Sequence, residues 1–192
     1  TMAVVATTTW TNSQPHSAIR VGTNVYIGTH GWSSIQRIAT ATMTITGTIP
    51  TWVIGNKYTA TDWTFLYVAG ETGSLRKVDL STFTVVWTAT VWNTPYWVAL
   101  DNGFAYVTNN TSSTVSQVDT TTMTTVGSVS VWMWPIWITI YNGFAYVANQ
   151  NSATVSKIDL STFTVVATSG ALGGAPYWIW QSQWFIYVTA QA

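Results

Sequence analysis

Residues 141–166 read YNGFAYVANQNSATVSKIDLSTFTVV, and this unit recurs along almost the whole chain. Residues 101–126 read DNGFAYVTNNTSSTVSQVDTTTMTTV, and residues 61–86 read TDWTFLYVAGETGSLRKVDLSTFTVV. Residues 21–46 are a more degenerate copy, and SQWFIYVTAQA at 182–192 begins a fifth. A repeat of about 20–50 residues is typical of architectures built from stacked structural units. The chain is therefore expected to be a repeat protein.

One tyrosine in each copy marks the phase of the repeat. These residues are Tyr26, Tyr67, Tyr106, Tyr146 and Tyr187. Their spacings of 41, 39, 40 and 41 residues define five units of about forty residues. Within one unit, four short segments rich in Val, Thr and aromatic residues have the signature of strands. In the third unit these segments lie at 95–100, 104–109, 114–118 and 122–128.

The residues between these segments predict tight turns. Asn102-Gly103 and Asn142-Gly143 separate the first and second segments, and Asn-Gly favours the two-residue hairpin turn. An Asp followed by Ser or Thr residues stands between the third and fourth segments, at Asp79, Asp119 and Asp159. Four antiparallel strands repeated at this period describe the blades of a β-propeller. We expect an all-β fold, with residues 1–192 forming a single five-bladed propeller domain.

The two ends of the chain are expected to share the last blade. TMAVVAT at 1–7 matches TFTVVAT at 162–168, which predicts a fourth strand at the N-terminus. The strands at 176–180 and 184–190, within residues 176–190, would supply the first and second. No residues correspond to 152–161, so the third strand of that blade is missing from the sequence. It is absent because the blade is built differently, or is supplied by a partner, or lies in residues beyond this sequence.

Charge is unusually scarce in this chain. It has six basic and six acidic residues, so its net charge is zero and 6% of its residues are charged, against about 25% in typical domains. This composition argues against nucleic acid and anionic membranes as partners, and a nearly uncharged surface favours association. Residues 120–156 carry no charge, but Pro135, Asn142 and Gly143 interrupt them. We therefore interpret them as strands and not as a membrane span.

The segments AYVTNNTSSTVSQVD at 105–119 and AYVANQNSATVSKIDLSTFTVV at 145–166 resemble the YVTN family of β-propeller repeats. That family occurs in bacterial and archaeal surface-layer and secreted proteins, and similar repeats occur in phage structural proteins. The resemblance implies an extracellular, cell-surface or virion location. It does not imply an activity, because one fold supports many functions. This chain departs from the pattern in its ring of five units and in Trp97, Trp137 and Trp178, which replace small residues.

One polar residue follows each repeat tyrosine by four positions. These residues are His30, Glu71, Asn110, Gln150 and Gln191. His30 and Glu71 would lie in adjacent blades, and such a pair could act as acid and base in a propeller lyase or hydrolase. We favour the simpler interpretation that all five are polar loop positions. The chain has no cysteine and no cluster of metal ligands in its sequence, so we expect no metal site, no cofactor and no enzymatic activity.

Aromatic residues form the second candidate set, which makes one face of the propeller rich in tryptophan. Trp92, Trp132 and Trp134 lie just before a first strand, and Tyr58, Trp97, Trp137 and Trp178 lie at its start, near the propeller axis. Flat rings beside Asn or Gln suit sugars. They also suit a protein contact when exposed, or act as bulky wedges between blades when buried.

These patterns favour a non-catalytic structural or interaction propeller on a cell envelope or virion. Its partners would be other protein subunits of an assembly, surface glycans, or both, bound through the Trp-rich face. The alternative is a multivalent carbohydrate-binding lectin with Asn110 and Gln150 beside the aromatic rings. Asn109 and Asn110 each begin an N-x-Ser/Thr sequon and are weak candidates for glycosylation.

Overall fold

The computed structural model describes residues 14–30, 34–50, 56–70, 72–183 and 185–191. Every element in this part of the chain is a β-strand. The first sheet consists of β1 (Gln14–Val21), β2 (Asn24–His30), β3 (Ser34–Ala39) and β4 (Thr44–Pro50). The second consists of β5 (Asn56–Thr61), β6 (Phe65–Gly70), β7 (Ser74–Asp79) and β8 (Thr84–Thr90).

The three remaining sheets continue the same pattern. The third consists of β9 (Pro95–Asp101), β10 (Phe104–Asn109), β11 (Thr114–Asp119) and β12 (Thr124–Ser130). The fourth consists of β13 (Pro135–Tyr141), β14 (Phe144–Asn149), β15 (Thr154–Asp159) and β16 (Thr164–Thr168). The fifth consists of β17 (Ala175–Ser182) and β18 (Phe185–Gln191). Among the described residues, no helix is long and apolar enough to cross a membrane.

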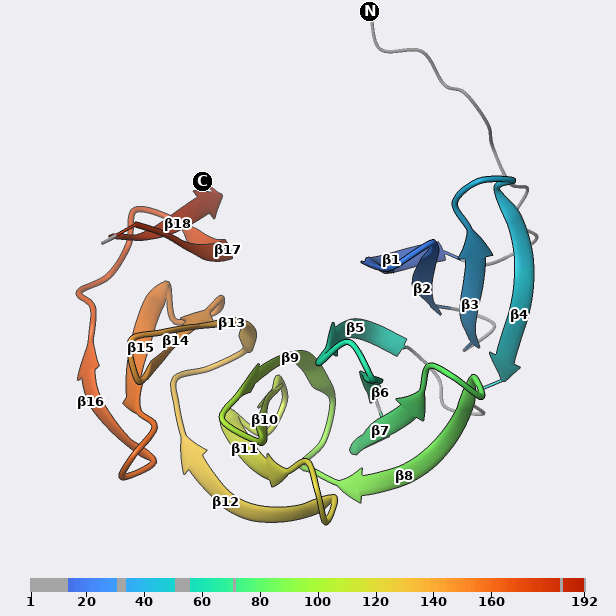
Figure 1. Cartoon of the computed structure of the whole chain (residues 1–192). Helices are drawn as coiled ribbons and strands as arrows, with labels where there is room; N and C mark the ends of the chain where they lie inside the picture. Colours follow the sequence, from blue (N-terminus) through green and yellow to red (C-terminus); the bar gives the residue numbers. More distant parts are fainter. Residues whose placement is uncertain (1–13, 31–33, 51–55, 71, 184, 192) are drawn as a thin grey trace, which may run out of the picture.

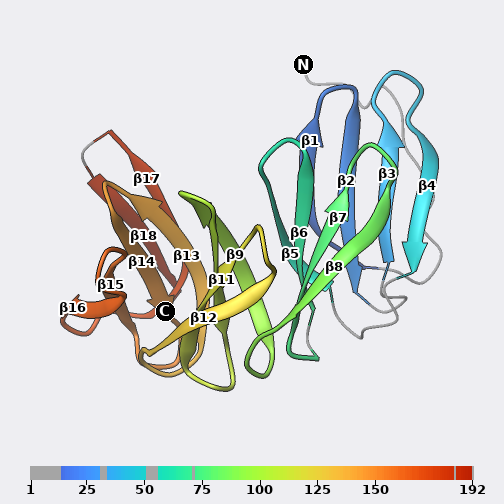
Figure 2. The ribbon, with the colours of Figure 1, turned by 60° about the horizontal axis from the view of Figure 1, so that its bottom comes forward.

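Each sheet is an antiparallel meander in which consecutive strands pair. In Figure 1 the sheets follow one another around an arc, with β4, β8, β12 and β16 on the outside. Figure 2 shows β1 to β4 standing upright, so that their connections lie at two opposite faces. The predicted all-β, five-bladed β-propeller is therefore confirmed, and we call the five sheets blades 1 to 5.

The hairpin turns form as their residues predict. Asn102 and Gly103 have φ values of 45° and 80°, and Asn142 and Gly143 have values of 51° and 79°. Positive φ at both central residues matches the turn to the twist of the flanking strands. Asp119 Oδ1 accepts hydrogen bonds from two backbone N–H groups just ahead, which closes the next turn. This local chemistry fixes the turn between the first and second strands and the turn between the third and fourth.

The fourth strand begins later than predicted. In blade 3 it spans Thr124–Ser130, not 122–128. Residues 120–123 are used by the turn that Asp119 closes, and Met123 has a φ of 52°, outside the strand region. The Thr-rich composition, which favours strand, hides this boundary because the turn is rich in Thr as well.

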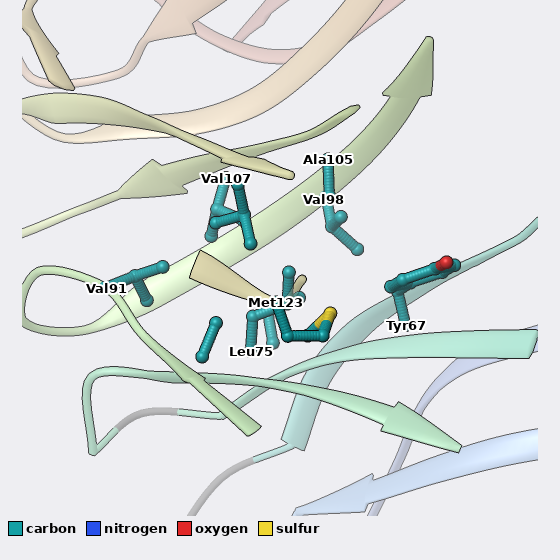
Figure 3. Close-up of a cluster of buried hydrophobic side chains, with 10 residues drawn as sticks. Tyr67, Leu75, Val91, Val98, Ala105, Val107 and Met123 are labelled. Carbon is teal, nitrogen blue, oxygen red and sulfur yellow. The ribbon is translucent and has the colours of Figure 1, made fainter. Parts of the chain in front are cut away.

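The hydrophobic core lies between successive blades. Tyr67 and Leu75 of blade 2 share one buried cluster with Val98, Val107 and Met123 of blade 3, as Figure 3 shows. The repeat tyrosine of one blade meets the side chain that ends the third-to-fourth turn of the next. Ring centroids are 5.7 Å apart for Tyr26 and Phe83, and 5.9 Å for Tyr106 and Phe163.

Two glycines make room for this contact. A Cβ atom at Gly47 would lie 2.8 Å from the Phe83 ring, and one at Gly127 would lie 2.9 Å from the Phe163 ring. Real Cβ atoms essentially never approach that closely. The outer strand of one blade therefore needs glycine where the phenylalanine of the next blade lies against it.

Blade 5 differs from the others because its described part is only the β17–β18 hairpin. Tyr187 of β18 is 43% exposed, whereas Tyr67 at the same repeat position is 1% exposed. The strand predicted at 1–7, and with it the closure of the ring, lies outside the described residues. The repeat tyrosine of blade 5 is thus exposed, whereas those of blades 1 to 3 are buried.

Candidate binding face

The connections between the second and third strands lie beside those that lead into the first strands. We call this side of the propeller the upper face. In blade 3, Asn110 N–H donates to the carbonyl of Thr94 at 2.9 Å, and in blade 4, Gln150 N–H donates to the carbonyl of Trp134 at 2.9 Å. The same hydrogen bond therefore anchors both loops in both blades. Thr94 and Trp134, each preceding a proline, have φ values of 53° and 59°.

The three loop tryptophans are exposed on this upper face. Trp92 and Trp132 are each 55% exposed, Met133 is 53% exposed and Trp134 is 47% exposed. Met133 N–H donates to Ser152 Oγ at 2.8 Å, which anchors the loop. We call Trp92, Trp132, Met133 and Trp134 the loop-tryptophan patch. Large apolar side chains on anchored loops bind a partner at little cost in conformational entropy.

The four strand aromatics lie together near the propeller axis. The Trp97 centroid is 4.1 Å from that of Tyr58 and 3.2 Å from that of Trp137, and Trp178 lies 4.4 Å from Trp137. We call these four residues the axial stack. Their mutual contact fits the role of wedges between blades. Trp178, at one end of the stack, is still 48% exposed.

A cavity of about 400 Å³ borders the axial stack. Its described lining residues are His16, Ser17, Ala18, Ile19, Tyr58, Thr59, Trp97, Trp137 and Trp178. Burial, followed by the neighbouring Tyr96, raises the pKa of the Tyr58 phenol, which stays protonated at neutral pH. The described lining therefore includes no Asp, Glu, Lys or Arg and is largely aromatic, with a few polar groups contributed by blades 1 and 2.

The polar candidates do not form one described cluster. The side chains of His30 and Glu71 lie outside the described part of the structure, so their proposed acid–base pairing stays a prediction. Asn110 Nδ2 makes a long contact of 3.5 Å to the carbonyl of Pro135, and Gln150 is half-buried. Within the described residues, no three His, Cys, Asp or Glu side chains come together as metal ligands.

The two sequon asparagines have different surroundings. Asn109 is fully buried, and its Nδ2 donates to Thr114 Oγ1 at 3.0 Å and to Ser116 Oγ at 2.9 Å. Nδ2 is the atom that a glycan would join, and in Asn109, a weak candidate for glycosylation, it is engaged in these two hydrogen bonds. Asn149 makes the same pair of contacts in blade 4, which indicates a structural role.

Sequence reasoning missed a second pocket, on the lower face between blades 2 and 3. It has a volume of about 320 Å³, and Asp62, Tyr67 and Asp101 are among its lining residues. Tyr67 O–H donates to Asp62 Oδ2 at 3.0 Å, and burial together with this bond raises the Tyr67 pKa. Both carboxylate oxygens of Asp62 are already used as acceptors, because Oδ1 also accepts hydrogen bonds from two backbone N–H groups. These residues are far apart in the sequence and come together only because blades 2 and 3 are neighbours, so the sequence alone does not predict the pocket.

No protein-family model matches the chain, and no curated protein matches it in sequence. Solved structures do resemble it. Hydrazine synthase from Kuenenia stuttgartiensis matches with a TM-score of 0.75 and 20% identity, over 87% of this chain and 52% of that chain. The computationally designed protein Ika8 matches with a TM-score of 0.81 and 9% identity, over 94% and 56%. BamB from Moraxella catarrhalis matches with a TM-score of 0.70 and 17% identity, over 90% and 54%.

Hydrazine synthase and BamB are β-propeller proteins. At these identities the likeness shows the fold alone. The chain spans about half the length of the structures it matches. Any activity or partner must therefore be argued from this chain's own residues.

Proposed function

We propose that this chain is a non-catalytic β-propeller that joins protein subunits into an assembly through the loop-tryptophan patch. The observation that carries the proposal is the exposure of Trp92, Trp132 and Trp134 on anchored loops of one face. Exposed apolar side chains gathered on one face of a domain mark interaction sites, and tryptophan is enriched among the residues that dominate interface energies.

Magnitudes support an interface at this patch. Covering about 100 Å² of one tryptophan contributes about 2.5 kcal/mol, and the patch has three tryptophans and a methionine. The chain has zero net charge, so little repulsion opposes contact between two copies. A second copy of the same chain is therefore the simplest partner, and two-fold pairing of one patch with itself is the commonest way in which subunits associate.

Sedimentation over a concentration series tests this proposal. We expect the wild type to associate, and the variant Trp92→Ser/Trp132→Ser/Trp134→Ser to remain monomeric with an unchanged circular dichroism spectrum. The control variant Trp63→Ser/Trp87→Ser removes tryptophans that are 71% and 58% exposed elsewhere, and it should associate like the wild type. A wild type that stays monomeric at millimolar concentration would refute the proposal.

Glycan binding is the second candidate function. Beside Trp92 stand Asn93 and the hydroxyl pair of Thr94 and Thr111, whose oxygens are 3.0 Å apart. An apolar ring face next to amide and hydroxyl groups is suited to a sugar. A glycan array probed with the wild type and with Trp92→Ser tests this function, and the absence of any Trp92-dependent signal would exclude it.

We further infer an extracellular, cell-surface or virion location for the assembly. Support comes from the scarcity of charge and from the resemblance of residues 105–119 to YVTN repeats. Protease treatment of intact cells or particles that carry the chain should degrade it. Full protection in that experiment would contradict the inferred location.

A further inference from the structure

One strand position carries an aromatic residue in four blades and a serine in the remaining blade. The residue lies on the first strand, opposite the position two after the repeat tyrosine. Ser17 pairs there with Gly28, as Trp137 pairs with Ala148 and Trp178 pairs with Thr189. The members of the set are Ser17, Tyr58, Trp97, Trp137 and Trp178. Blade 1 therefore lacks the ring that every other blade contributes near the axis.

The cavity of about 400 Å³ lies where that fifth ring would be. It is lined by Ser17 and its neighbours on β1, and by Tyr58 and Trp178 from the two ends of the axial stack. The rings between those ends are in contact with one another, with centroids 3.2 to 4.4 Å apart. The volume of the cavity falls within the range of about 300–1,000 Å³ typical of small-molecule sites.

We propose that this cavity binds a neutral, planar aromatic ring of indole size, which takes the stacking place that Ser17 leaves in blade 1. Aromatic pairs gain about 0.5–1.5 kcal/mol beyond their area burial when their rings are offset or tilted. Trp178, which is 48% exposed, and Tyr58, whose ring centroid lies 6.4 Å from that of His16, are the rings of the stack that border this place. Ser17 Oγ lies at the wall and can accept a hydrogen bond from a ring N–H.

The polarity of the lining favours an aromatic ligand over a sugar. Its polar side-chain groups are those of His16, Ser17 and Thr59, the Tyr58 hydroxyl and the indole N–H groups of its tryptophans, and Thr59 Oγ1 already donates to Ser17 Oγ at 3.3 Å. A pyranose brings several hydroxyl groups, and each one left unpaired on burial costs about 1–3 kcal/mol. An indole has a single polar group to satisfy against this mainly aromatic lining, whereas a pyranose has several.

The charge and ring geometry also disfavour a cationic ligand. The described lining includes no Asp or Glu to neutralise a cation. Cation–π binding is strongest when several open ring faces surround the charge. In the axial stack, Trp97 and Trp137 cover each other's faces at 3.2 Å with planes 27° apart.

Calorimetric titration with indole tests the proposal. We expect saturable one-to-one binding to the wild type, and loss of at least about tenfold in affinity for Ser17→Trp, whose own ring fills the cavity. Ser17→Ala, which removes only the hydroxyl, should lose less affinity. The control variant Thr23→Trp adds a tryptophan at an exposed position in the β1–β2 turn and should bind indole like the wild type.

A second variant keeps the test decisive if Ser17→Trp fails to fold. Trp178→Ala removes a ring that is 48% exposed and should weaken indole binding, and its circular dichroism spectrum checks that the variant folds. Galactose and tetramethylammonium serve as the sugar and cation probes. The proposal is overturned if indole does not bind the wild type, if it binds Ser17→Trp equally well, or if either of the other probes binds more tightly than indole.

Discussion

At the residue scale, the contact between Gly127 and Phe163 shows how side-chain size sets the approach of two blades. Phe163 of blade 4 lies against β12 at the point where Gly127 has no side chain. Between blades 2 and 3 both residues differ. Trp87 of β8, which pairs with Lys77, stands at the position of Gly127, which pairs with Gln117. Met123 of blade 3 stands at the position of Phe163. The rigid phenylalanine ring thus lies against a glycine. Where the outer strand carries tryptophan, a flexible methionine replaces the phenylalanine.

This size rule predicts the cost of one methyl group. Gly127→Ala should reduce the free energy of unfolding by about 1–3 kcal/mol, the usual penalty for overpacking, as measured by urea denaturation. Gly170→Ala, where a Cβ atom would meet nothing within 4 Å, should change it by less than about 0.5 kcal/mol. Adding Phe163→Met to Gly127→Ala should restore part of the loss. Equal effects at Gly127 and Gly170 would contradict the rule.

The two neighbouring asparagines mark the limit of sequence reasoning at this scale. Asn109 and Asn110 look alike in the sequence, yet Asn109 is fully buried and Asn110 is half-buried. The difference arises because Asn109 is the last residue of β10, opposite Thr114. Strand alternation then directs its amide toward Thr114 and Ser116. Only the exact end of the strand separates a structural amide from a loop amide.

At the element scale, the three aspartate turns give the blades a common dependence on pH. The Ser81 hydroxyl, and after it the N–H groups of Ser81 and Thr82, hold the pKa of Asp79 below its usual value. The hydroxyl and N–H groups of Ser161 lower the pKa of Asp159 in the same way, and the N–H groups of Thr122 and Thr121 lower that of Asp119. In each turn the charged carboxylate is the form that closes the turn.

The sign of the pH effect follows from these lowered pKa values. A carboxylate with a lowered pKa in the folded state stabilises the fold above its unfolded pKa of about 3.9 and loses that contribution as the pH falls through the folded value. We expect the melting temperature to decline below about pH 4. In the variant Asp79→Asn/Asp119→Asn/Asp159→Asn, which cannot titrate at these turns, the decline should be shallower. Identical pH profiles for both proteins would contradict this role of the turns.

Strands and hairpin turns could be predicted from the sequence because their causes are local. The Asn102-Gly103 turn and the strand Phe104–Asn109 were predicted at their observed positions. The start of β12 was not, since Thr-rich turn and Thr-rich strand look the same. The aromatic residues near the axis could be placed by repeat position, but the contact of Trp97 with Trp137 depends on how five blades converge. The cavity beside Ser17 depends on the same convergence.

At the scale of the whole molecule, the buried contacts between blades and the loops of the upper face are separate surfaces with different roles. Buried contacts between blades repeat around the arc in Figure 1 and use the same positions each time. The loops of the upper face are free of that constraint, so blades 3 and 4 can carry Trp92, Trp132 and Trp134 without loss of packing. The scaffold explains why tryptophan is tolerated on these loops, and the interface proposal explains why it is exposed there.

Hydroxyl-radical footprinting over a concentration series tests the proposed interface most directly. The account predicts that oxidation of Trp92, Trp132 and Trp134 decreases as the protein associates. Oxidation of Trp63 and Trp87, which are 71% and 58% exposed away from the patch, should stay constant in the same samples. Constant oxidation of the three loop tryptophans, or protection of Trp63 and Trp87 in their place, would contradict it.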